Sequence, residues 1–215
     1  KRRFLTPIGR VTVIKTLLIP KLNHLFISIP NPKKEILSSL CKAMFEFLWN
    51  SKVDKVRRNV ITQDYLLGGL KMVDVNLFII SLKCSWIKRL TSCTCYSSKP
   101  WMDMFFAVNG KNSLVHLYDF GDTFVQQYML NINNAFWKDV LESWLYFMKV
   151  YDKQENFRNN FYSIPVWYNS NIKIGNKSVF FKSWYEKGVK VVQDFLDEDG
   201  NFLCNDVFQQ LYNLD

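Results

Sequence analysis

Four basic side chains fall within seven residues, at Lys52, Lys55, Arg57 and Arg58, and Asp54 is the only acid among them. A cluster of this kind suits phosphate groups, because each cation that contacts a nucleic acid backbone releases a condensed counterion. The guanidinium fork of arginine also matches the geometry of phosphate. A solvated polar loop has the same composition, so the cluster indicates phosphate binding only when other cations support it.

Such cations lie on the apolar segment near the start of the chain. Arg10, Lys15 and Lys21 interrupt it, and a charge on a mostly buried helix needs a partner. Arg2 and Arg3 precede the segment, and Lys88 and Arg89 stand near the end of a later expected helix. The full candidate set for nucleic-acid binding is Arg2, Arg3, Arg10, Lys15, Lys21, Lys52, Lys55, Arg57, Arg58, Lys88 and Arg89.

The charge of the chain is distributed unevenly. Residues 1–90 carry 17 Lys and Arg against 5 Asp and Glu, a net charge of +12, whereas residues 91–215 carry 11 against 14, a net charge of −3. This asymmetry predicts a polyanionic partner for one half only, nucleic acid first and anionic membrane second. Lys or Arg interrupts the apolar runs well short of a membrane span, so we expect no membrane partner and an intracellular chain.

No arrangement of residues in the sequence predicts catalysis. Polymerase chemistry with two metal ions needs two aspartates close in space, and no Asp-Asp pair occurs. The acidic run from Asp197 to Gly200 is typical of a structural turn. Cys93 and Cys95 have no further ligands at zinc-finger spacing. We therefore expect no catalytic residue, no metal and no cofactor.

The first expected helix begins at Thr6, the N-cap, with Pro7 in its first turn. It would extend toward Ile29 and pass through Pro20, which should kink it or divide it in two. Apolar residues surround most of its axis, and a helix of that kind is expected to be buried between other elements.

The remaining elements of residues 1–90 follow from local patterns. Residues 33–49 have the spacing of an amphipathic helix. A polar connection over Asn50–Asn59 follows, and Gly68-Gly69 predicts a turn. Asp74 is the expected N-cap of a helix that reaches Leu90.

Fewer elements are predicted after residue 90. The Ser-, Thr- and Cys-rich stretch 91–100 is the expected linker to an aromatic-rich helical region over 101–215. We expect a helix at about 134–150 and a hairpin at 171–181. A short helix should stop at Gly188, and a final helix should follow Asn205. The predicted fold is mainly α, a helical segment followed by a second helical region with one or two short β-hairpins.

Several strings of the sequence resemble the reverse transcriptase proteins of LINE-type (non-LTR) retrotransposons. The strongest are LTPIGRVTVIKTLLIPKLNHLFISIPNP, FEFLWN, KVRRNVI, GGLKMVDV and CSWIKRL, and the weaker ones are FWKDVLESW, PVWYN and GVKVVQDFLDEDGNF. The region resembled lies just after the polymerase core, where the thumb gives way to a helical segment. Residues 1–90 would thus be a thumb and post-thumb region.

The resemblance implies a role without chemistry. The parent protein would be an RNA-directed DNA polymerase with an endonuclease, but the fingers, palm, endonuclease and terminal Cys/His knuckle have no counterpart in this sequence. Arg10, Lys15 and Lys21 would face the template–primer duplex, and the cluster at 52–58 would contact phosphates farther along the RNA.

The expected partners are RNA or RNA–DNA hybrid (element RNA and target DNA) and the remainder of the reverse transcriptase. The expected location is the nucleus and a cytoplasmic ribonucleoprotein. The alternative is a helical scaffold that docks onto the polymerase core, or a decayed element copy, with no independent nucleic-acid binding.

Overall fold

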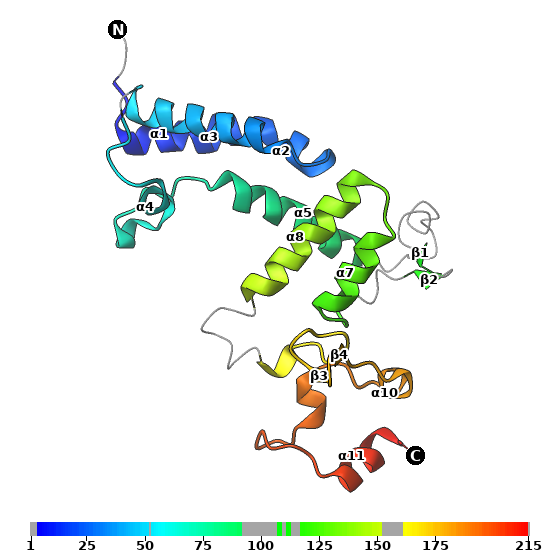
Figure 1. The fold of residues 1–215 in the computed structure, drawn as a ribbon. Helices are drawn as coiled ribbons and strands as arrows, with labels where there is room; N and C mark the ends of the chain where they lie inside the picture. The colour runs from blue at the N-terminus through cyan, green and yellow to red at the C-terminus, as the bar shows by residue number, and fades with distance from the viewer. Residues whose placement is uncertain are drawn as a thin grey trace. The chain divides into compact units, whose positions relative to one another are not determined.

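The computed structural model describes residues 4–51, 53–91, 107–108, 111–112, 117–151 and 161–214. Within these ranges the protein is mainly helical with two short antiparallel hairpins, as the sequence predicts (Figure 1). It divides into a first unit, Lys1–Trp86, and a second unit, Ile87–Asp215. This boundary falls inside helix α5, a few residues before the linker expected at 91–100. Residues 92–100 lie outside the described ranges.

The first unit opens with the predicted helix. Helix α1 (Pro7–Val13) runs on through the π-helical segment η1 (Ile14–Leu18) into α2 (Ile19–Ser28). Thr6 is the N-cap as expected, since its Oγ1 accepts a hydrogen bond from the amide of Gly9 at 3.2 Å. The helix therefore starts where the sequence predicts.

Pro20 neither ends this helix nor splits it into separate helices. The amide of Ile19 donates to the carbonyl of Ile14, five residues back, so the hydrogen-bond ladder widens to the π pattern just before the proline. A wider turn accommodates a residue that has no N–H to donate, at a place where an ordinary α-helix would lose a bond and meet a clash.

The expectation that this helix is buried between other elements is wrong. Its buried side chains are Val11, Ile14, Ile19 and Phe26. Its strongly exposed apolar side chains are Ile8, Leu17 and Leu25, and Ile29, just after its end, is exposed as well. The described protein covers the helix on one side and leaves apolar side chains of the other side open.

The same helix is long and apolar enough to cross a membrane by length and composition. It spans 22 residues, Pro7–Ser28, and 22% of its most apolar stretch is buried within the protein. Lys15 and Lys21 interrupt its apolar runs, so a criterion based on uninterrupted runs does not detect it. Core helices of water-soluble proteins meet the same criterion, so the finding is weak evidence for a membrane partner.

Helix α3 (Lys34–Trp49) returns beside α1 and α2 (Figure 1). It confirms the amphipathic helix expected at 33–49. It ends at Asn50, whose φ of 57° places it in the left-handed region that closes many helices. Its apolar face is covered toward the C-terminus, where Trp49 packs into the core, but Ile36 and Phe47 are exposed.

The connection from α3 to α5 (Val75–Thr91) contains α4 (Arg58–Thr62) and the 3-10 turn η2 (Tyr65–Leu67). The carbonyl of Ile61 accepts bonds from the amides of Leu70 and Met72, both at 3.0 Å. Gly69 is buried at the crossing, where an added Cβ would stand 2.1 Å from the carbonyl oxygen of Gln63. The predicted Gly68-Gly69 turn is confirmed, and its second glycine is there because two backbones meet.

Helix α5 contributes Val75 and Ile79 to the apolar core of the first unit. Asp74 is its N-cap as predicted, accepting bonds from the amides of Asn76 and Leu77 at 2.9 and 3.1 Å. Farther along, the fully buried Lys83 donates to the carbonyl of Ile29 at 2.5 Å, and Trp86 Nε1 donates to that of Ile27 at 2.7 Å. Two side chains of α5 thus bind carbonyls at the end of α2.

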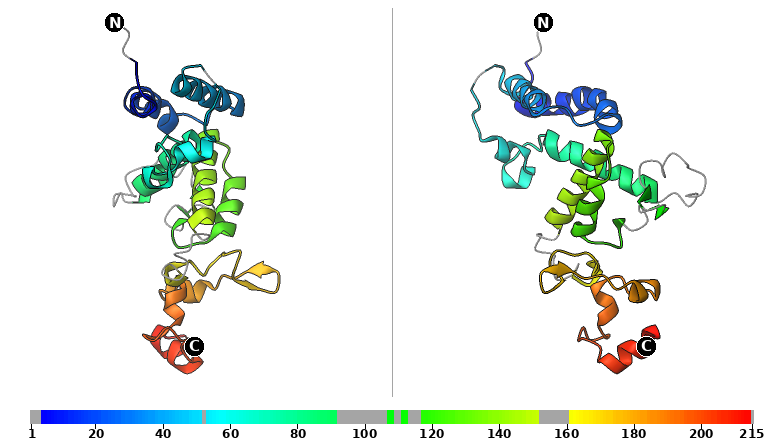
Figure 2. Two further views of the ribbon diagram at one scale, coloured as in Figure 1. Left: turned by 90° about the vertical axis from the view of Figure 1, so that its left-hand side faces the viewer. Right: turned by 45° about the vertical axis from the view of Figure 1, so that its right-hand side comes forward.

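The second unit contains two adjacent helices, α7 (Asp122–Leu130) and α8 (Ala135–Tyr151), which lie side by side (Figure 2). Helix α8 confirms the helix expected at 134–150. Helix α7 was not predicted. Its start at Gly121 has no side-chain cap, so the usual sequence signal for a helix N-terminus is missing.

The other elements of the second unit are short. They are β1 (Ala107–Val108), β2 (Lys111–Asn112), η5 (Phe161–Ser163), β3 (Lys173–Ile174), β4 (Lys177–Ser178), α10 (Lys182–Glu186), η6 (Val192–Phe195) and α11 (Asn205–Tyr212). Strand β3 pairs with β4 around Gly175-Asn176, which confirms the predicted hairpin. The second strand is shorter than expected, because Phe181 already precedes α10. The helices expected before Gly188 and after Asn205 are α10 and α11.

An aromatic cluster forms the core around Trp167, which is 1% exposed. Its indole Nε1 donates to the carbonyl of Val189 at 2.6 Å. Phe120 contacts Phe180 and Tyr185 with ring centroids 5.3 and 5.0 Å apart. Large rings fill this core because they bury much area per residue, and edge-to-face contacts orient them.

The buried glycine of the turn gives a first prediction. Gly69→Ala should destabilise the first unit by about 3 kcal/mol or more, because a Cβ there would overlap the backbone. Gly68→Ala is the control: its φ of 77° is strained for alanine but the space is open, so the cost should be about 1 kcal/mol. Urea unfolding and hydrogen exchange of the amides at 58–72 measure both. Equal losses would contradict the backbone crossing.

The indole hydrogen bond gives a second prediction. Trp167→Phe should cost the second unit about 2–3 kcal/mol, since it leaves the Val189 carbonyl without its donor and opens a void. Trp184→Phe removes the same atoms from a half-buried ring that makes no hydrogen bond to the described residues, and should cost about 1 kcal/mol. Urea midpoints compare the two. A larger loss of stability for Trp184→Phe would show that ring packing, and not the indole hydrogen bond, determines the cost.

Candidate nucleic-acid interface

Two residues of the predicted basic cluster, Lys55 and Arg57, lie in the loop between α3 and α4, and Arg58 is the first residue of α4. Lys55 and Arg57 are exposed there, and neither side chain forms a hydrogen bond or an ion pair with the described residues. Lys52 lies outside the described ranges. An exposed cation without a counterion is what a phosphate contact requires, because the cation gives up no internal partner when it binds.

Arg58 is held within the protein. Its Nε lies 2.9 Å from Asp54 Oδ2, and its guanidinium carbon stands 4.6 Å from the centroid of the Phe45 ring. These contacts fix the end of the loop to α3. The side chain is still 48% exposed, so the pair contributes little stability in water. Of the three clustered cations that the structure describes, Arg58 is the one whose side chain binds other groups of the protein.

Arg10 binds the end of α3. Its NH1 group donates to the carbonyls of Phe47 and Leu48 at 2.9 and 3.4 Å, and its Nε donates to that of Leu5 at 3.2 Å. The last carbonyls of a helix lack partners and carry partial negative charge, so a guanidinium there is favourable. A contact between Arg10 and the duplex backbone stays a prediction. In such a contact the guanidinium would bind phosphate while it also binds these carbonyls.

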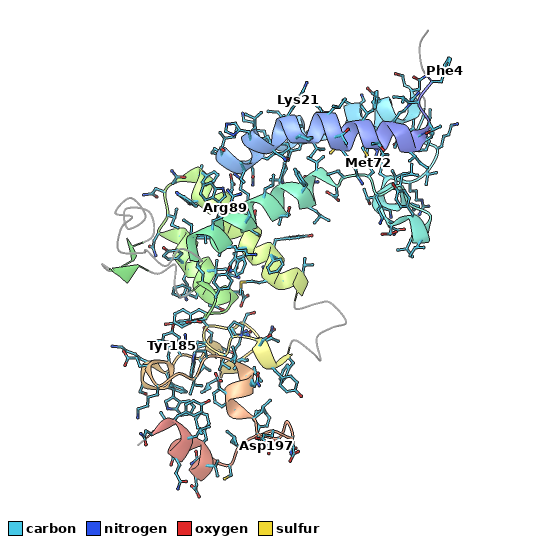
Figure 3. The ribbon with its side chains drawn as sticks, turned by 180° about the vertical axis from the view of Figure 1, so that it is seen from behind. Phe4, Lys21, Met72, Arg89, Tyr185 and Asp197 are labelled. Atoms are coloured by element: carbon cyan, nitrogen blue, oxygen red, sulfur yellow. The ribbon has the colours of Figure 1, made fainter. Side chains whose placement is uncertain are left out.

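The other cations of the first helix differ from Arg10. Lys15 is half-buried, whereas Lys21 is exposed on the side of the helix turned away from α5 (Figure 3). The Lys21 side chain forms no hydrogen bond or ion pair with the described residues and stands among apolar side chains. Arg2 and Arg3 lie outside the described ranges.

Lys88 and Arg89 are exposed in the last turn of α5. Each has an interaction within the protein, so neither is a free cation. Both stand where cations favour the C-terminal end of a helix. They belong to the second unit, whereas the other candidate cations belong to the first.

The described residues contain no group of three His, Cys, Asp or Glu that could hold a metal ion. Asp197 forms the predicted turn: its Oδ1 accepts bonds from the amides of Asp199 and Asn201 at 3.0 and 2.8 Å. Burial raises the pKa of the Cys84 thiol to about 11, which keeps it protonated and unreactive near neutral pH. Cys93 and Cys95 lie outside the described ranges.

Sequence reasoning missed the structural role of Lys83. The sequence does indicate that Lys83 is buried, because it occupies a row of every fourth residue with the apolar Val75, Ile79 and Ile87. All four side chains are buried in the structure. A lysine in such a row must find a polar partner inside the protein. The net charge of the first unit therefore overstates the number of cations that a nucleic acid could reach.

The capping role of Arg10 gives a third prediction. Arg10→Ala should lower the stability of the first unit by about 1 kcal/mol, because three backbone carbonyls lose a charged donor. Lys21→Ala, on the same helix, should change stability by less than about 0.5 kcal/mol. Urea unfolding measures both. If Arg10→Ala keeps full stability, the cap contributes nothing.

No protein-family model matches the chain, and no solved structure matches it.

Proposed function

We propose that the chain is a non-catalytic part of a retrotransposon reverse transcriptase that contacts RNA or RNA–DNA hybrid through its basic first unit. The observation that carries the proposal is the loop between α3 and α4, where Lys55 and Arg57 are exposed without a partner among the described residues. The resemblance of the sequence strings to LINE-type proteins supplies the kind of nucleic acid. A nuclear and cytoplasmic ribonucleoprotein location belongs to the same proposal.

Electrostatics favours this reading of the first unit. It carries 15 Lys and Arg against 5 Asp and Glu, a net charge of +10. Because Arg10, Arg58 and Lys83 bind groups of the protein itself, the accessible positive charge is concentrated on fewer side chains. Lys55, Arg57 and Lys21 are the exposed candidates in this unit whose side chains form no hydrogen bond or ion pair with the described residues. Contacts of this kind bind backbone phosphates and carry little sequence preference.

The proposed role has no chemical step. The sequence contains no Asp-Asp pair, and the described residues contain no metal-binding group. The purified chain is therefore expected to extend no primer and to cleave no nucleic acid with Mg²⁺ or Mn²⁺.

Binding to RNA as a function of salt tests the proposal. Lys55→Ala/Arg57→Ala should weaken binding to RNA and RNA–DNA hybrid of any sequence alike. The double variant should also flatten the slope of log K against log salt by about 1.5, which corresponds to two lost phosphate contacts. Folding should be unaffected, because both side chains are exposed. Fluorescence anisotropy with labelled oligonucleotides measures affinity and slope.

A charge-matched control separates a local contact from general attraction. Lys173→Ala/Lys177→Ala removes the same two charges from exposed positions in the β3–β4 hairpin, which is outside the candidate set. It should leave the slope unchanged. If both variants change the slope equally, the loop has no special role. If neither does, the docking-scaffold alternative replaces the proposal.

A further inference from the structure

An open apolar groove runs between the first helix and α3. Leu17 and Lys21 contribute to it from one side, and Leu40, Ala43 and Phe47 from the other. Its volume is about 350 Å³, which is within the range of pockets that accept ligands or large side chains. Leu17 is 60% exposed and Phe47 43% exposed, so the apolar lining is accessible to a partner.

The groove is open because the paired helices have two apolar sides and the described protein covers one. The covered side packs against residues of the turn and α5, among them Met72, Val75 and Ile79. An amphipathic surface helix needs a single apolar stripe, whereas the first helix carries apolar residues around most of its axis. Exposed apolar surface of this kind usually marks an interaction site.

The charge of the lining selects the kind of partner. Lys21 is the one charged residue of the lining, and it forms no ion pair with the described residues. A second copy of the chain would bring another unit with a net charge of +10 against the first, which is repulsive. A nucleic acid backbone complements the charge of Lys21 but brings few apolar groups to pack against the lining. An acidic protein segment matches both.

We propose that this groove binds an amphipathic helix of another protein segment, with its apolar side chains against Leu17, Ala43 and Phe47 and a carboxylate paired with Lys21. Two helices that already lie side by side offer a groove for a third, and anchors at i, i+3, i+4 and i+7 would fill it. The inference goes beyond the nucleic-acid role and does not depend on it. It gives the docking alternative a specific surface.

A designed peptide tests the groove with the full chain. The probe is a fluorescein-labelled helical peptide of about 18 residues, with Leu at helical spacing and Glu along the edge of the apolar face. A second peptide carries Lys in place of each Glu, and a third is a scramble. The acidic peptide should bind at least about tenfold tighter than the other two, a difference of about 1.4 kcal/mol.

Two double variants separate the groove from its surroundings. Leu17→Gln/Ala43→Gln places polar side chains in the groove and should weaken binding of the acidic peptide about tenfold or more. Ile8→Gln/Ile36→Gln changes one exposed apolar residue on each helix outside the lining, at 54% and 58% exposure, and should leave binding within about twofold. Far-ultraviolet circular dichroism verifies that both variants fold.

Reversal of the lysine tests the predicted ion pair. Lys21→Glu should weaken binding of the acidic peptide and strengthen binding of the Lys peptide. Weaker binding of both peptides would contradict the predicted ion pair. RNA binding is measured on the groove variant Leu17→Gln/Ala43→Gln in parallel and should be unchanged. Failure of the peptide and failure of RNA binding are thus separate results.

Three other results would overturn the inference. Equal binding of the acidic, basic and scrambled peptides would show non-specific attraction. Binding to phosphatidylcholine vesicles that the groove variant abolishes would assign the surface to a membrane. Concentration-dependent dimerisation that the same variant abolishes, seen by sedimentation, would assign it to a second copy.

Discussion

The first unit depends on the need to satisfy carbonyl groups at helix ends. The last carbonyls of any helix lack partners within it, and leaving them buried and unpaired costs about as much as a lost hydrogen bond. Side chains from elsewhere solve the problem here. Lys83 and Trp86 of α5 bind the end of α2, and Arg10 binds the end of α3. These three side chains tie the long helices of the unit to one another.

The same constraint changes the meaning of the charge asymmetry. From composition alone, all cations of the basic half count toward binding a polyanion, but a cation bound to a backbone carbonyl is part of the fold. Lys83 is fully buried and Arg10 is half-buried, whereas Lys55 and Arg57 are exposed. A salt-dependent association should draw on the exposed group, because only ions released from accessible contacts contribute to the slope.

Local signals in the sequence predicted local structure well. Thr6, Asp74 and Gly175 each act through a hydrogen bond or a positive φ within a few residues, and a pattern of that length is visible in the sequence. What was missed depends on distant partners. The need for glycine at position 69 comes from the backbone of Gln63, and the burial of Lys83 comes from the end of α2.

The first helix shows how a failed prediction can be informative. Its composition predicts cover on all sides, and the structure gives cover on one. Local propensity and tertiary environment usually agree in natural proteins, so a conflict between them points to a functional surface. The exposed apolar side chains are therefore better explained by a partner than by chance exposure.

Lys21 is a candidate for both proposals, as a contact for phosphate and as the partner of a carboxylate in the groove. The local dielectric constant favours one of them. A phosphate beside an exposed lysine stays in water, where two unit charges 4 Å apart gain only about 1 kcal/mol. A carboxylate carried by a packed helix would be brought to Lys21 together with apolar side chains that exclude water, where the effective dielectric constant is lower and the attraction several times larger. Packing would also offset the cost of ordering the lysine. Lys21 therefore belongs first to the groove, and the loop at Lys55 and Arg57 remains the better candidate for phosphate.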